Sequence, residues 1–405
     1  MKQIQALEIL KTGANAFLTG EPGSGKTYTI GLFRDWLENN DCTYAITAST
    51  GIAASHIGGT TIHSFCGFGI QRNLEKIDLD RIKWNPWISK RVRSIETLII
   101  DEISMLDATN IDDINKVFKT VHGNDKPFGG VQIVFVGDFF QLPPVSKDRN
   151  VQFAFQSDAW KEANPTTCYL TEQHRQSDQE FLDILTAMRS GTISAEQKDR
   201  LIACQTARRP DTQLFTHNAD VDYINKTELE KLPDELHSFD MESGGIDFLV
   251  KTLKKDCLSP ERLDLKVGAV VMFTRNNFEE GYVNGSIGKV IMFTPVGQPV
   301  IELQNGNTVF APKAEWQFLE NRIVKAWIRQ IPLRLAYAIT VHKSQGMSLD
   351  SASVDLSRAF EFGQGYVAIS RVRTLEGLHL AGLNENAFAM HPVVIEQDII
   401  FRNTI

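Results

Sequence analysis

The sequence contains little cysteine. Five cysteines are scattered over 405 residues, and no two of them form a C-x-x-C pair. An odd number at this spacing argues against a disulfide framework and against a cysteine-based zinc site, and it is typical of a reducing cytosol. We interpret all five as buried small hydrophobic side chains. They are Cys42, Cys66, Cys168, Cys204 and Cys257.

Long hydrophobic runs are also missing. No apolar stretch approaches the roughly 20 residues that a membrane-spanning helix needs, so we expect no membrane segment. The first residues, Met1-Lys2-Gln3-Ile4, lead almost directly into a structured motif, which predicts that there is no signal or transit peptide. We therefore expect a cytoplasmic protein, associated with the nucleoid if the source is bacterial.

The chain has no excess of positive charge. Its net charge is −8 and its isoelectric point is about 5.7. This balance argues against a stoichiometric DNA coat but not against a motor, which needs only a local positive channel. One stretch between Glu320 and Asp350 has basic residues and no acidic ones, and it indicates either such a channel or a solvated basic face. Its cations are Arg322, Lys325, Arg329, Arg334 and Lys343.

The first part of the chain alternates β-type and helical runs. This alternation predicts a parallel sheet flanked by helices over the first ~175 residues. A stretch around Cys66–Trp87 interrupts it and is interpreted as a small insert. The predicted strands are Ala16–Thr19, Tyr44–Ala48, Thr97–Ile100 and Val131–Val136, and the predicted helices are Thr27–Glu38 and Asn110–Val121.

A second α/β region is predicted to begin near Arg175. Within it, residues 265–325 change to short β-type runs separated by Asn284-Gly285 and Asn305-Gly306, which are strong tight-turn signals. We interpret 265–325 as a small β-barrel inserted in the second α/β domain. The flanking elements are predicted at Leu214–Thr216, Val221–Leu232, Val354–Leu356 and Leu378–Ala381.

A complete phosphate-binding loop follows the first predicted strand. Residues Gly20–Thr27 match the P-loop pattern and lead into a helix, as the motif requires. Glycines such as Gly23 and Gly25 let the backbone N–H groups, including that of Ser24, curl around phosphates. Lys26 supplies charge to the β- and γ-phosphates, and the Thr27 hydroxyl can hold Mg²⁺. The sequence therefore predicts an ATP site.

Two later strands end in polar residues that suit the same chemistry. Asp101 and Glu102 follow the buried run Leu98–Ile100, so we expect Asp101 to hold Mg²⁺ and Glu102 to activate the attacking water. Val134–Val136 leads into a segment that contains Gln141, which can contact the γ-phosphate. A polar turn stiffened by Pro143 and Pro144 is the alternative.

The ordered motifs resemble those of superfamily 1B DNA helicases, most closely the Pif-type family. The resemblance covers nearly the whole chain. Gly20–Thr27 resembles motif I, Thr47–Ala54 motif Ia, Asp101-Glu102 motif II, Gly137–Pro144 motif III, Arg175 motif IV, Val341–Gly346 motif V and Tyr366–Arg371 motif VI, and Lys126–Gly130 is similar to a Pif-type stretch.

The resemblance implies an α/β fold with two RecA-like P-loop NTPase domains and ATP in their cleft. Domain 1A is expected at 1–174 with a wedge insert at about 66–87, domain 2A at 175–264 and 326–405, and an inserted Src-homology-type β-barrel, 2B, at 265–325. The activity implied is ATP-dependent 5′→3′ translocation on single-stranded DNA with unwinding at duplex junctions. We expect the protein to function as a monomer. Replication, repair, recombination and telomere-type maintenance are the implied settings.

Individual residues also acquire roles from the resemblance. Arg175 and Arg371 are expected to stabilise charge during ATP hydrolysis. Gln3 is similar in placement to the adenine-reading glutamine, with Gln5 as the alternative, and Gly346 is assigned to the nucleotide. The implied DNA contacts are Thr47, Ser49, Thr50, Thr60, His63 and Phe65 in the first domain and Thr340, His342, Lys343 and Ser344 in the second.

Other functions remain open at this point. Within the same class, the chain can be a RecD- or Dda-like helicase, or a translocase that strips proteins without unwinding. From a different class, a P-loop switch ATPase that binds a protein partner would show no stimulation by single-stranded DNA. Motifs V and VI have no use in such a switch, and they favour the helicase.

Overall fold

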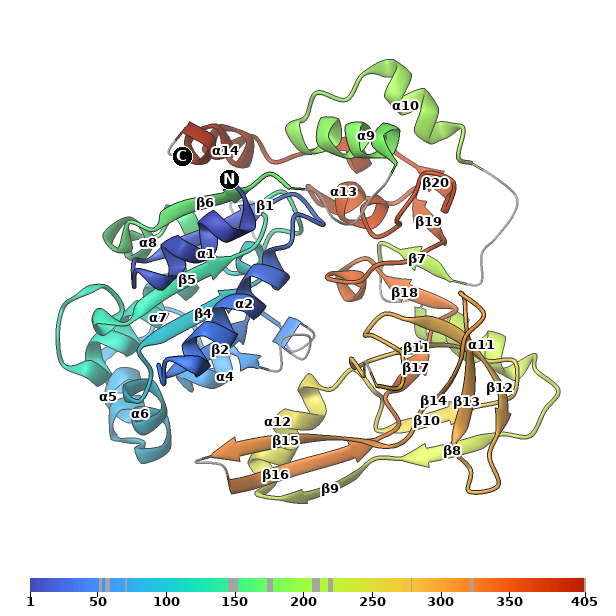
Figure 1. Ribbon diagram of the computed structural model, residues 1–405, viewed down its shortest axis with the longest axis horizontal. Coiled ribbons are helices and arrows are strands. Elements are labelled where there is room, and N and C mark those ends of the chain that lie inside the picture. Colours follow the sequence, from blue (N-terminus) through green and yellow to red (C-terminus); the bar gives the residue numbers. More distant parts are fainter. Residues whose placement is uncertain are drawn as a thin grey trace. The chain divides into compact units, whose positions relative to one another are not determined.

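The chain divides into two compact units, each of which is built from separate stretches of sequence. The computed structural model describes residues 1–50, 53–54, 59–69, 71–144, 152–172, 178–205, 212–217, 221–277, 279–320 and 323–403. Unit 1 comprises Met1–Ile193, Glu361–Tyr366 and Phe388–Ile405, and unit 2 comprises Ser194–Phe360 and Val367–Ala387 (Figure 1). Unit 1 therefore includes residues 175–193 and a C-terminal segment that the sequence analysis assigned to the second domain.

Unit 1 is organised around a six-stranded sheet in the order β3-β2-β4-β5-β1-β6, and all its neighbouring strands pair in parallel. Buried apolar runs produce these strands, because a parallel sheet is covered on both faces. The predicted parallel sheet is confirmed. The strands are β1 (Ala16–Gly20), β2 (Tyr44–Ala48), β3 (Thr60–Thr61), β4 (Thr97–Asp101), β5 (Gln132–Val136) and β6 (Thr166–Leu170).

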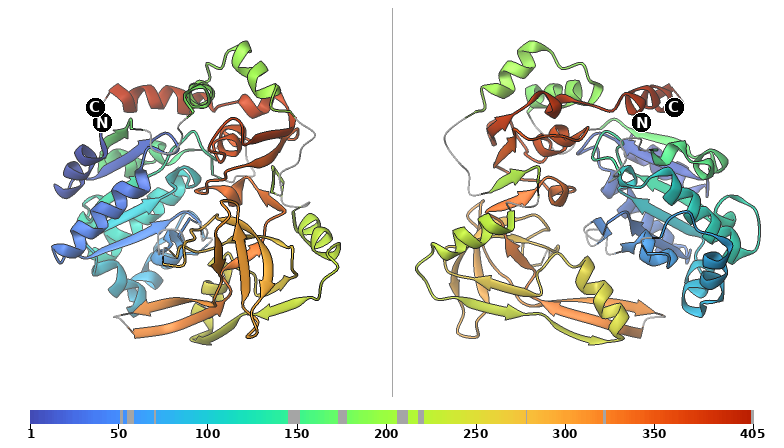
Figure 2. Two further views of the ribbon diagram at one scale, coloured as in Figure 1. Left: turned by 45° about the vertical axis from the view of Figure 1, so that its right-hand side comes forward. Right: turned by 180° about the vertical axis from the view of Figure 1, so that it is seen from behind.

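Helices cover both faces of this sheet (Figures 1 and 2). Helices α1 (Gln3–Lys11) and α2 (Lys26–Asn39) share a core with alternate side chains of β1, β4, β5 and β6. On the other face, Phe17 of β1 contacts Trp160 and Phe401, with ring centroids 5.1 and 4.9 Å away. Those two rings belong to α8 (Asp158–Ala163) and α14 (Pro392–Asn403).

The remaining unit 1 elements have clear start and stop signals. Helix α7 (Ala108–His122) begins after Asp107, whose carboxylate accepts the Asn110 N–H, and it ends at the left-handed Gly123. The predicted insert is helical and packs on α7. Its helices are α5 (Lys76–Trp84) and α6 (Pro86–Arg93), and α4 (Ile62–Cys66) precedes it. Helix α9 (Gln179–Ser190) and the 3₁₀ turns Ile103–Met105, Pro127–Gly130 and Ala154–Gln156 complete the unit.

Unit 2 contains a smaller parallel sheet in the order β18-β7-β19-β20. Asn225 of α11 (Val221–Glu230) fixes this helix to the sheet, since its side chain both donates to and accepts from the Ala338 backbone at 2.9 and 3.0 Å. The other elements of unit 2 are β7 (Gln213–Phe215), β18 (Ala338–Thr340), β19 (Ala352–Leu356), β20 (Leu378–Leu383), α10 (Ala195–Ile202) and the 3₁₀ turn His342–Ser344. Helix α13 (Gln364–Ile369) and the 3₁₀ turn Glu385–Phe388 each contain residues of both units.

A β-rich insert interrupts this second sheet between α11 and β18. Ten strands and helix α12 (Asp247–Asp256) are described between 237 and 335, so the insert is larger than the predicted 265–325. The predicted turn at Asn305-Gly306 is present between β13 and β14, with Gly306 at φ 83°. The strands are β8 (His237–Asp240), β9 (Glu242–Gly245), β10 (Arg262–Leu265), β11 (Val270–Phe273), β12 (Ile287–Phe293), β13 (Pro299–Leu303), β14 (Thr308–Phe310), β15 (Ala314–Glu320), β16 (Ile323–Gln330) and β17 (Leu333–Leu335).

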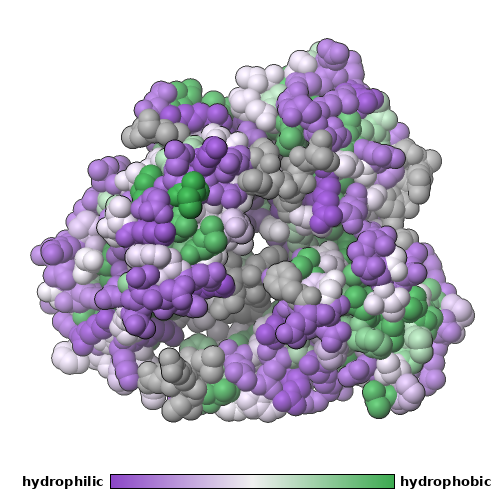
Figure 3. Space-filling model, viewed as in Figure 1, coloured by the Kyte–Doolittle hydropathy of each residue, from purple (hydrophilic) through white to green (hydrophobic). Residues whose placement is uncertain are grey.

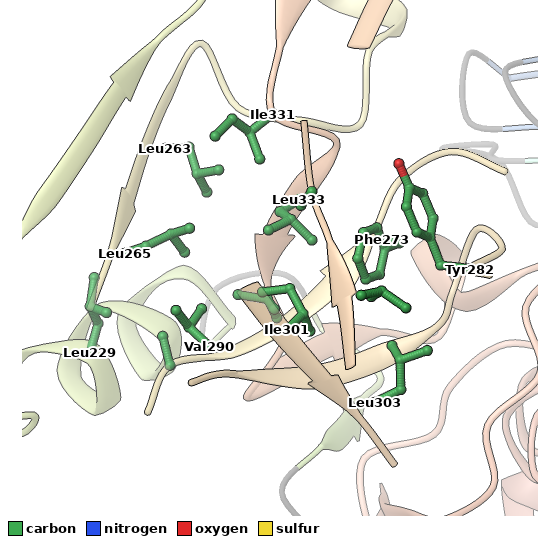
Figure 4. Packing of buried hydrophobic residues seen from close by; sticks show 14 residues of the cluster. Leu229, Leu263, Leu265, Phe273, Tyr282, Val290, Ile301, Leu303, Ile331 and Leu333 are labelled. Carbon is green, nitrogen blue, oxygen red and sulfur yellow. The ribbon is translucent and has the colours of Figure 1, made fainter. Parts of the chain in front are cut away.

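The insert has a hydrophobic core of its own. Leu263, Leu265, Phe273, Ile301 and Leu333 are among the side chains that meet there (Figure 4). Leu263 lies before the predicted barrel bounds of 265–325, and Leu333 lies after them. The predicted barrel was therefore too short. On the face of the molecule that Figure 3 shows, hydrophobic residues gather over β12–β14. No helix among the described residues is long and apolar enough to cross a membrane.

Candidate active site

The P-loop lies between β1 and α2, as its sequence predicts. Gly23 and Gly25 have φ of 88° and 86°, in the left-handed region that glycine adopts at little cost. Gly25 has a second reason to be glycine, because a Cβ there would collide with the side chain of Gln3. The loop therefore begins at the end of a buried strand and delivers the chain into the first turn of a helix, where backbone N–H groups can bind an anion.

The amine of Lys26 is held inside this loop. Its Nζ donates to Gly20 O at 2.7 Å and to Glu21 O at 3.1 Å. Burial lowers the pKa of Lys26, Arg189 lowers it further, and the nearby carboxylates of Asp138, Glu102 and Asp101 oppose the shift. The Ser24 hydroxyl is buried and has no hydrogen-bond partner among the described residues. Both groups are the kind that phosphate oxygens would satisfy.

The two acidic residues after β4 have different environments. Asp101 Oδ1 accepts the backbone N–H of Glu102 at 2.8 Å. Burial raises the pKa of Asp101, while that hydrogen bond and Lys26 act in the opposite direction. Glu102 itself has φ 51° and ψ 48°, an unusual conformation for a non-glycine residue and one that is concentrated at functional sites. The strand end thus presents two carboxylates on a sharply turned backbone.

These residues also suit a magnesium ion. Mg²⁺ prefers oxygen ligands and is usually held by one or two protein groups together with substrate phosphates and water. Thr27 contributes an exposed hydroxyl at the start of α2, and Asp101 contributes a carboxylate. The described residues contain no cluster of three or more histidine, cysteine or acidic side chains that could hold a metal by themselves. A magnesium ion bound jointly with ATP fits this set.

Motif III follows β5 and is buried. Asp138 has no exposed surface, and its Oδ1 accepts the Phe140 N–H at 3.2 Å. The Gln141 N–H donates to Asp138 O at 3.0 Å, and the Gln141 residue is 7% exposed. Asp138 therefore organises the short turn that carries the candidate γ-phosphate sensor.

Asp138 has a partner that the sequence analysis missed. Arg189 of α9 is 2% exposed, and its Nη2 donates to Asp138 Oδ1 at 3.1 Å. Tyr366 donates to the other carboxylate oxygen at 3.5 Å. The available signal was a cation on the apolar face of a helix, because Arg189 follows Phe181 and Leu185 at intervals of four residues. No local motif marked it.

Gln3 contacts the P-loop directly. Its Nε2 donates to Ser24 O at 3.2 Å, and its backbone N–H donates to Glu172 Oε2 at 3.1 Å. Gln5, the alternative considered from sequence, is exposed and accepts the Lys2 N–H at the start of α1. The structure thus places Gln3, and not Gln5, beside the phosphate-binding loop.

The two candidate arginines have different outcomes. Arg175 lies outside the described residues. Arg371 belongs to unit 2 and is 2% exposed. It donates to Val367 O at 2.9 Å, to Ser370 Oγ at 2.9 Å and to Met347 O at 3.4 Å. Gly346, assigned to the nucleotide by resemblance, is exposed and has φ 78°.

The candidate DNA contacts of motif Ia are not equivalent. Thr47 is fully buried, and its hydroxyl donates to Ile99 O at 2.9 Å inside the sheet. The hydroxyl therefore holds β2 to β4 in this structure and does not face a ligand. Ser49 Oγ is buried with no hydrogen-bond partner in the described part of the chain, and the Thr50 hydroxyl accepts the Ala53 N–H at 3.2 Å.

Several residues predicted to contact DNA around β3 and α4 instead contact other residues of unit 1. Thr60 makes a long hydrogen bond to Thr61 O at 3.4 Å, and His63 Nε2 is 3.2 Å from Asn110 Oδ1. Phe65 is 6% exposed, and the Arg91 guanidinium covers its ring at 5.1 Å. Phe65 is therefore a core residue in this structure and offers no open stacking face.

Motif V in unit 2 has two buried and two partly exposed candidates. Thr340 and Ser344 are buried; Thr340 Oγ1 accepts the Lys343 N–H at 3.2 Å, and Ser344 Oγ donates to Val341 O at 2.8 Å. His342 and Lys343 are partly exposed. Burial lowers the pKa of Lys343, and Arg334 lowers it further. The hydroxyls thus shape the turn, while the histidine and lysine present polar groups.

The chain is similar to known helicases along its whole length. Residues 1–199 match the sequence profile of PIF1-like helicases, and residues 248–293 match that of the 2B domain of DNA helicase Pif1. The ATP-dependent DNA helicase Pif1 of Psychrobacter sp. (strain PRwf-1) is 40% identical, over all of this chain and 71% of the relative.

Solved structures agree with this match. Bacteroides sp Pif1 in complex with ADP-AlF4 superimposes with a TM-score of 0.87 at 29% identity, covering 99% of this chain and 96% of that one. Bacteroides Pif1 bound to single-stranded DNA has a TM-score of 0.70 at 30% identity, covering 100% of this chain and 97% of that one. The fold is thus the α/β, two-domain RecA-like arrangement, and the chain belongs to the PIF1-like helicase family, whose matched members are ATP-dependent DNA helicases.

Proposed function

We propose that the chain hydrolyses ATP with Mg²⁺ at the P-loop of unit 1 and uses the cycle to move 5′→3′ along single-stranded DNA and separate duplexes. The single observation that carries the ATP site is Lys26. Its amine is held within the loop of Gly20–Thr27, in the field of Asp101 and Glu102. A cation and two acids around one helix start are the arrangement that phosphoryl transfer requires.

Within this site each residue has a separate task. When ATP binds, the Lys26 amine gives up its hydrogen bonds to the two backbone carbonyls and donates to phosphate oxygens instead. Its positive charge then lies next to the phosphates. Glu102 orients and deprotonates the attacking water. Gln141 contacts the γ-phosphate and reports its loss. Magnesium, held by Thr27 and Asp101, would neutralise phosphate charge and help to orient the reacting group.

Positive charge for the transition state comes from arginine. We assign Arg371, together with Arg175, to this role because guanidinium groups stabilise the charge that develops on the phosphoryl oxygens. In this structure Arg371 donates to Val367, Ser370 and Met347, and these hydrogen bonds hold its guanidinium in one orientation.

DNA is gripped by groups that the structure leaves accessible or unsatisfied. Ser49 and Thr50 in unit 1, and His342 and Lys343 in unit 2, are the residues we retain for backbone contacts. The single-stranded DNA complex of Bacteroides Pif1 supports DNA as the ligand. Since Phe65 is covered by Arg91, stacking on bases requires other aromatic groups.

The wedge is assigned to the helical insert around α5 and α6. Trp84 and Trp87 lie at the junction of these two helices and are 78% and 58% exposed. Exposed indoles can replace the stacking that a separated base pair loses, worth roughly 1–3 kcal/mol per base. We also propose that a monomer is sufficient, with unit 1 as domain 1A, the parallel sheet of unit 2 as 2A and the β-rich insert as 2B.

The direction of movement can be tested with two DNA substrates. A partial duplex with a 5′ single-stranded tail should be unwound with ATP, whereas the same duplex with a 3′ tail should not. Lys26→Ala is the matched negative control and should unwind neither substrate. Unwinding of the 3′-tailed duplex alone would reverse the proposed polarity. Displacement of streptavidin from biotinylated DNA without strand separation would instead identify a protein-stripping translocase.

A further inference from the structure

Arg189 contacts two carboxylates from distant parts of the sequence, the buried Asp138 and the partly exposed Asp398. Its Nη2 lies 3.1 Å from Asp138 Oδ1 and 3.3 Å from Asp398 Oδ1, and its Nη1 lies 3.4 Å from Asp398 Oδ2. Asp138 is the second residue of motif III, and Asp398 belongs to α14. One guanidinium thus joins the turn beside the ATP site to the C-terminal helix.

Aromatic rings complete the surroundings of this guanidinium. It stacks over Phe140 at 4.1 Å and over Tyr169 at 5.6 Å. Phe140 is the residue immediately before Gln141, and its N–H already donates to Asp138 Oδ1. Motif III is therefore held from two directions, by an ion pair at Asp138 and by a cation–π contact at Phe140.

The residues linked to Asp138, directly or through Arg189, come from all three stretches of unit 1. Arg189 lies four residues before Ile193, where the chain first leaves the unit. Tyr366 is the last residue of the short return segment Glu361–Tyr366, and Asp398 belongs to the final return segment. Arg189 and Tyr366 therefore link Asp138 to two places where the chain passes between the units, and Asp398 links the final segment to the same guanidinium.

We propose that Arg189 is a positioning residue for ATP hydrolysis, which holds motif III, and with it Gln141, on the segments that join the two units. This inference rests on the proposed function of Gln141. A shift of Gln141 when the γ-phosphate leaves moves Asp138, and Asp138 carries Arg189 and Tyr366 with it. Arg189 thereby sets both the position of the sensor and the efficiency with which hydrolysis is used for movement.

Lysine cannot replace arginine in this role. A guanidinium is planar and can bridge two carboxylates while it stacks on a ring, whereas an ammonium is a single point charge. Arg189→Lys retains the positive charge beside Asp138 and so avoids an unpaired buried carboxylate. The substitution removes the bridge to Asp398 and the stacking on Phe140. It therefore separates the effect of positioning motif III from the effect of the positive charge.

Arg402 provides a matched control. Its Nε donates to the same Asp398 at 2.7 Å, and it lies over the same Tyr169 ring at 4.7 Å, but the described structure gives it no bond to motif III. Arg402→Gln therefore removes an ion pair to Asp398 within α14 and the contact of α14 with the Tyr169 ring, without altering the Asp138 ion pair. A purely structural role of the network predicts similar effects from Arg189→Lys and Arg402→Gln.

The test measures DNA-stimulated ATP hydrolysis and base pairs unwound per ATP consumed, with thermal unfolding as the check on folding. For Arg189→Lys we expect KM for ATP to stay within about twofold and kcat to fall at least about tenfold, because small misplacements of a reacting group have effects of this size. Base pairs unwound per ATP should fall as well, and Arg402→Gln should behave as wild type.

A second variant covers the case in which Arg189→Lys does not fold. Arg189→Met combined with Asp138→Asn removes both charges together, so no unpaired charge is buried, and it should bind ATP normally with the same loss of kcat. Wild-type kcat and coupling in either folded variant, or an equal loss in Arg402→Gln, would overturn the assignment. If wild-type protein shows no DNA-stimulated ATPase, the proposed function fails instead, and the two failures are distinguishable.

Discussion

Replacing Gly363 by alanine tests how firmly motif III is packed. Gly363 has φ 75° and lies in the return segment Glu361–Tyr366, where its N–H donates to Ala389 O at 3.0 Å. A Cβ at this position would overlap the carbonyl oxygen of Phe140 and would lie 2.9 Å from that of Gln141. Both are backbone atoms, so motif III or the return segment has to move.

The magnitude can be worked out from two contributions. A left-handed backbone costs a non-glycine residue about 1–2 kcal/mol. Forcing extra atoms into a packed site typically adds about 1–3 kcal/mol. Gly123→Ala provides the first contribution alone, because Gly123 is also in unit 1, has φ 68° and would place its Cβ with nothing within 4 Å. Gly363→Ala should therefore lose about 1–3 kcal/mol more than Gly123→Ala.

The assay must report on unit 1 by itself, since a chain of two units need not unfold in one step. Hydrogen exchange of the β1 and β5 amides gives the free energy of opening for this unit. We also expect Gly363→Ala, but not Gly123→Ala, to lower kcat for ATP, because the displaced carbonyls belong to the turn that carries Gln141. Equal losses of stability in the two variants would refute the packing argument.

Four further outcomes follow from the site. Glu102→Gln should still bind ATP but hydrolyse it roughly 10²-fold or more slowly, as a loss of general-base catalysis predicts; a wild-type rate would exclude Glu102 as the base. Arg371→Ala should lose ATPase activity and also destabilise unit 2, while nucleotide-free DNA affinity stays nearly unchanged in a binding titration. Trp84→Ala with Trp87→Ala should reduce strand separation without changing the melting temperature or single-strand ATPase, and full-speed unwinding would place the wedge elsewhere. DNA affinity should fall with salt with a log–log slope of about −0.7 per neutralised phosphate, and an affinity independent of salt would contradict an ionic grip.

The parts of the fold that the sequence predicted are those with short-range causes. Strands such as Tyr44–Ala48 are apolar runs bounded by polar residues, and both the sequence and the structure place a strand there. The P-loop lies between a strand and a helix because its glycines permit the required backbone. The Asn305-Gly306 turn is likewise determined by two adjacent residues.

The parts that were missed depend on contacts between distant residues. Nothing near Arg189 in sequence indicates that Asp138 and Asp398 are its partners. The β-rich insert was underestimated because β8 and β9 contain few apolar residues and are recognised only by pairing with β10 and β16. Phe65 is an aromatic residue of the kind that stacks on bases. Its ring is covered by the guanidinium of Arg91, which belongs to a different helix, and the local sequence does not show this contact.

The discontinuous course of the chain has a consequence for how the protein folds during synthesis. Phe401 contacts Phe17, Phe139 and Trp160 in the aromatic core of unit 1, yet it leaves the ribosome only after all of unit 2 has been made. During synthesis, unit 1 therefore has an incomplete core until the segments of unit 2 have been made. Contacts of such long sequence separation form slowly, and exposed apolar surface in the interval favours aggregation.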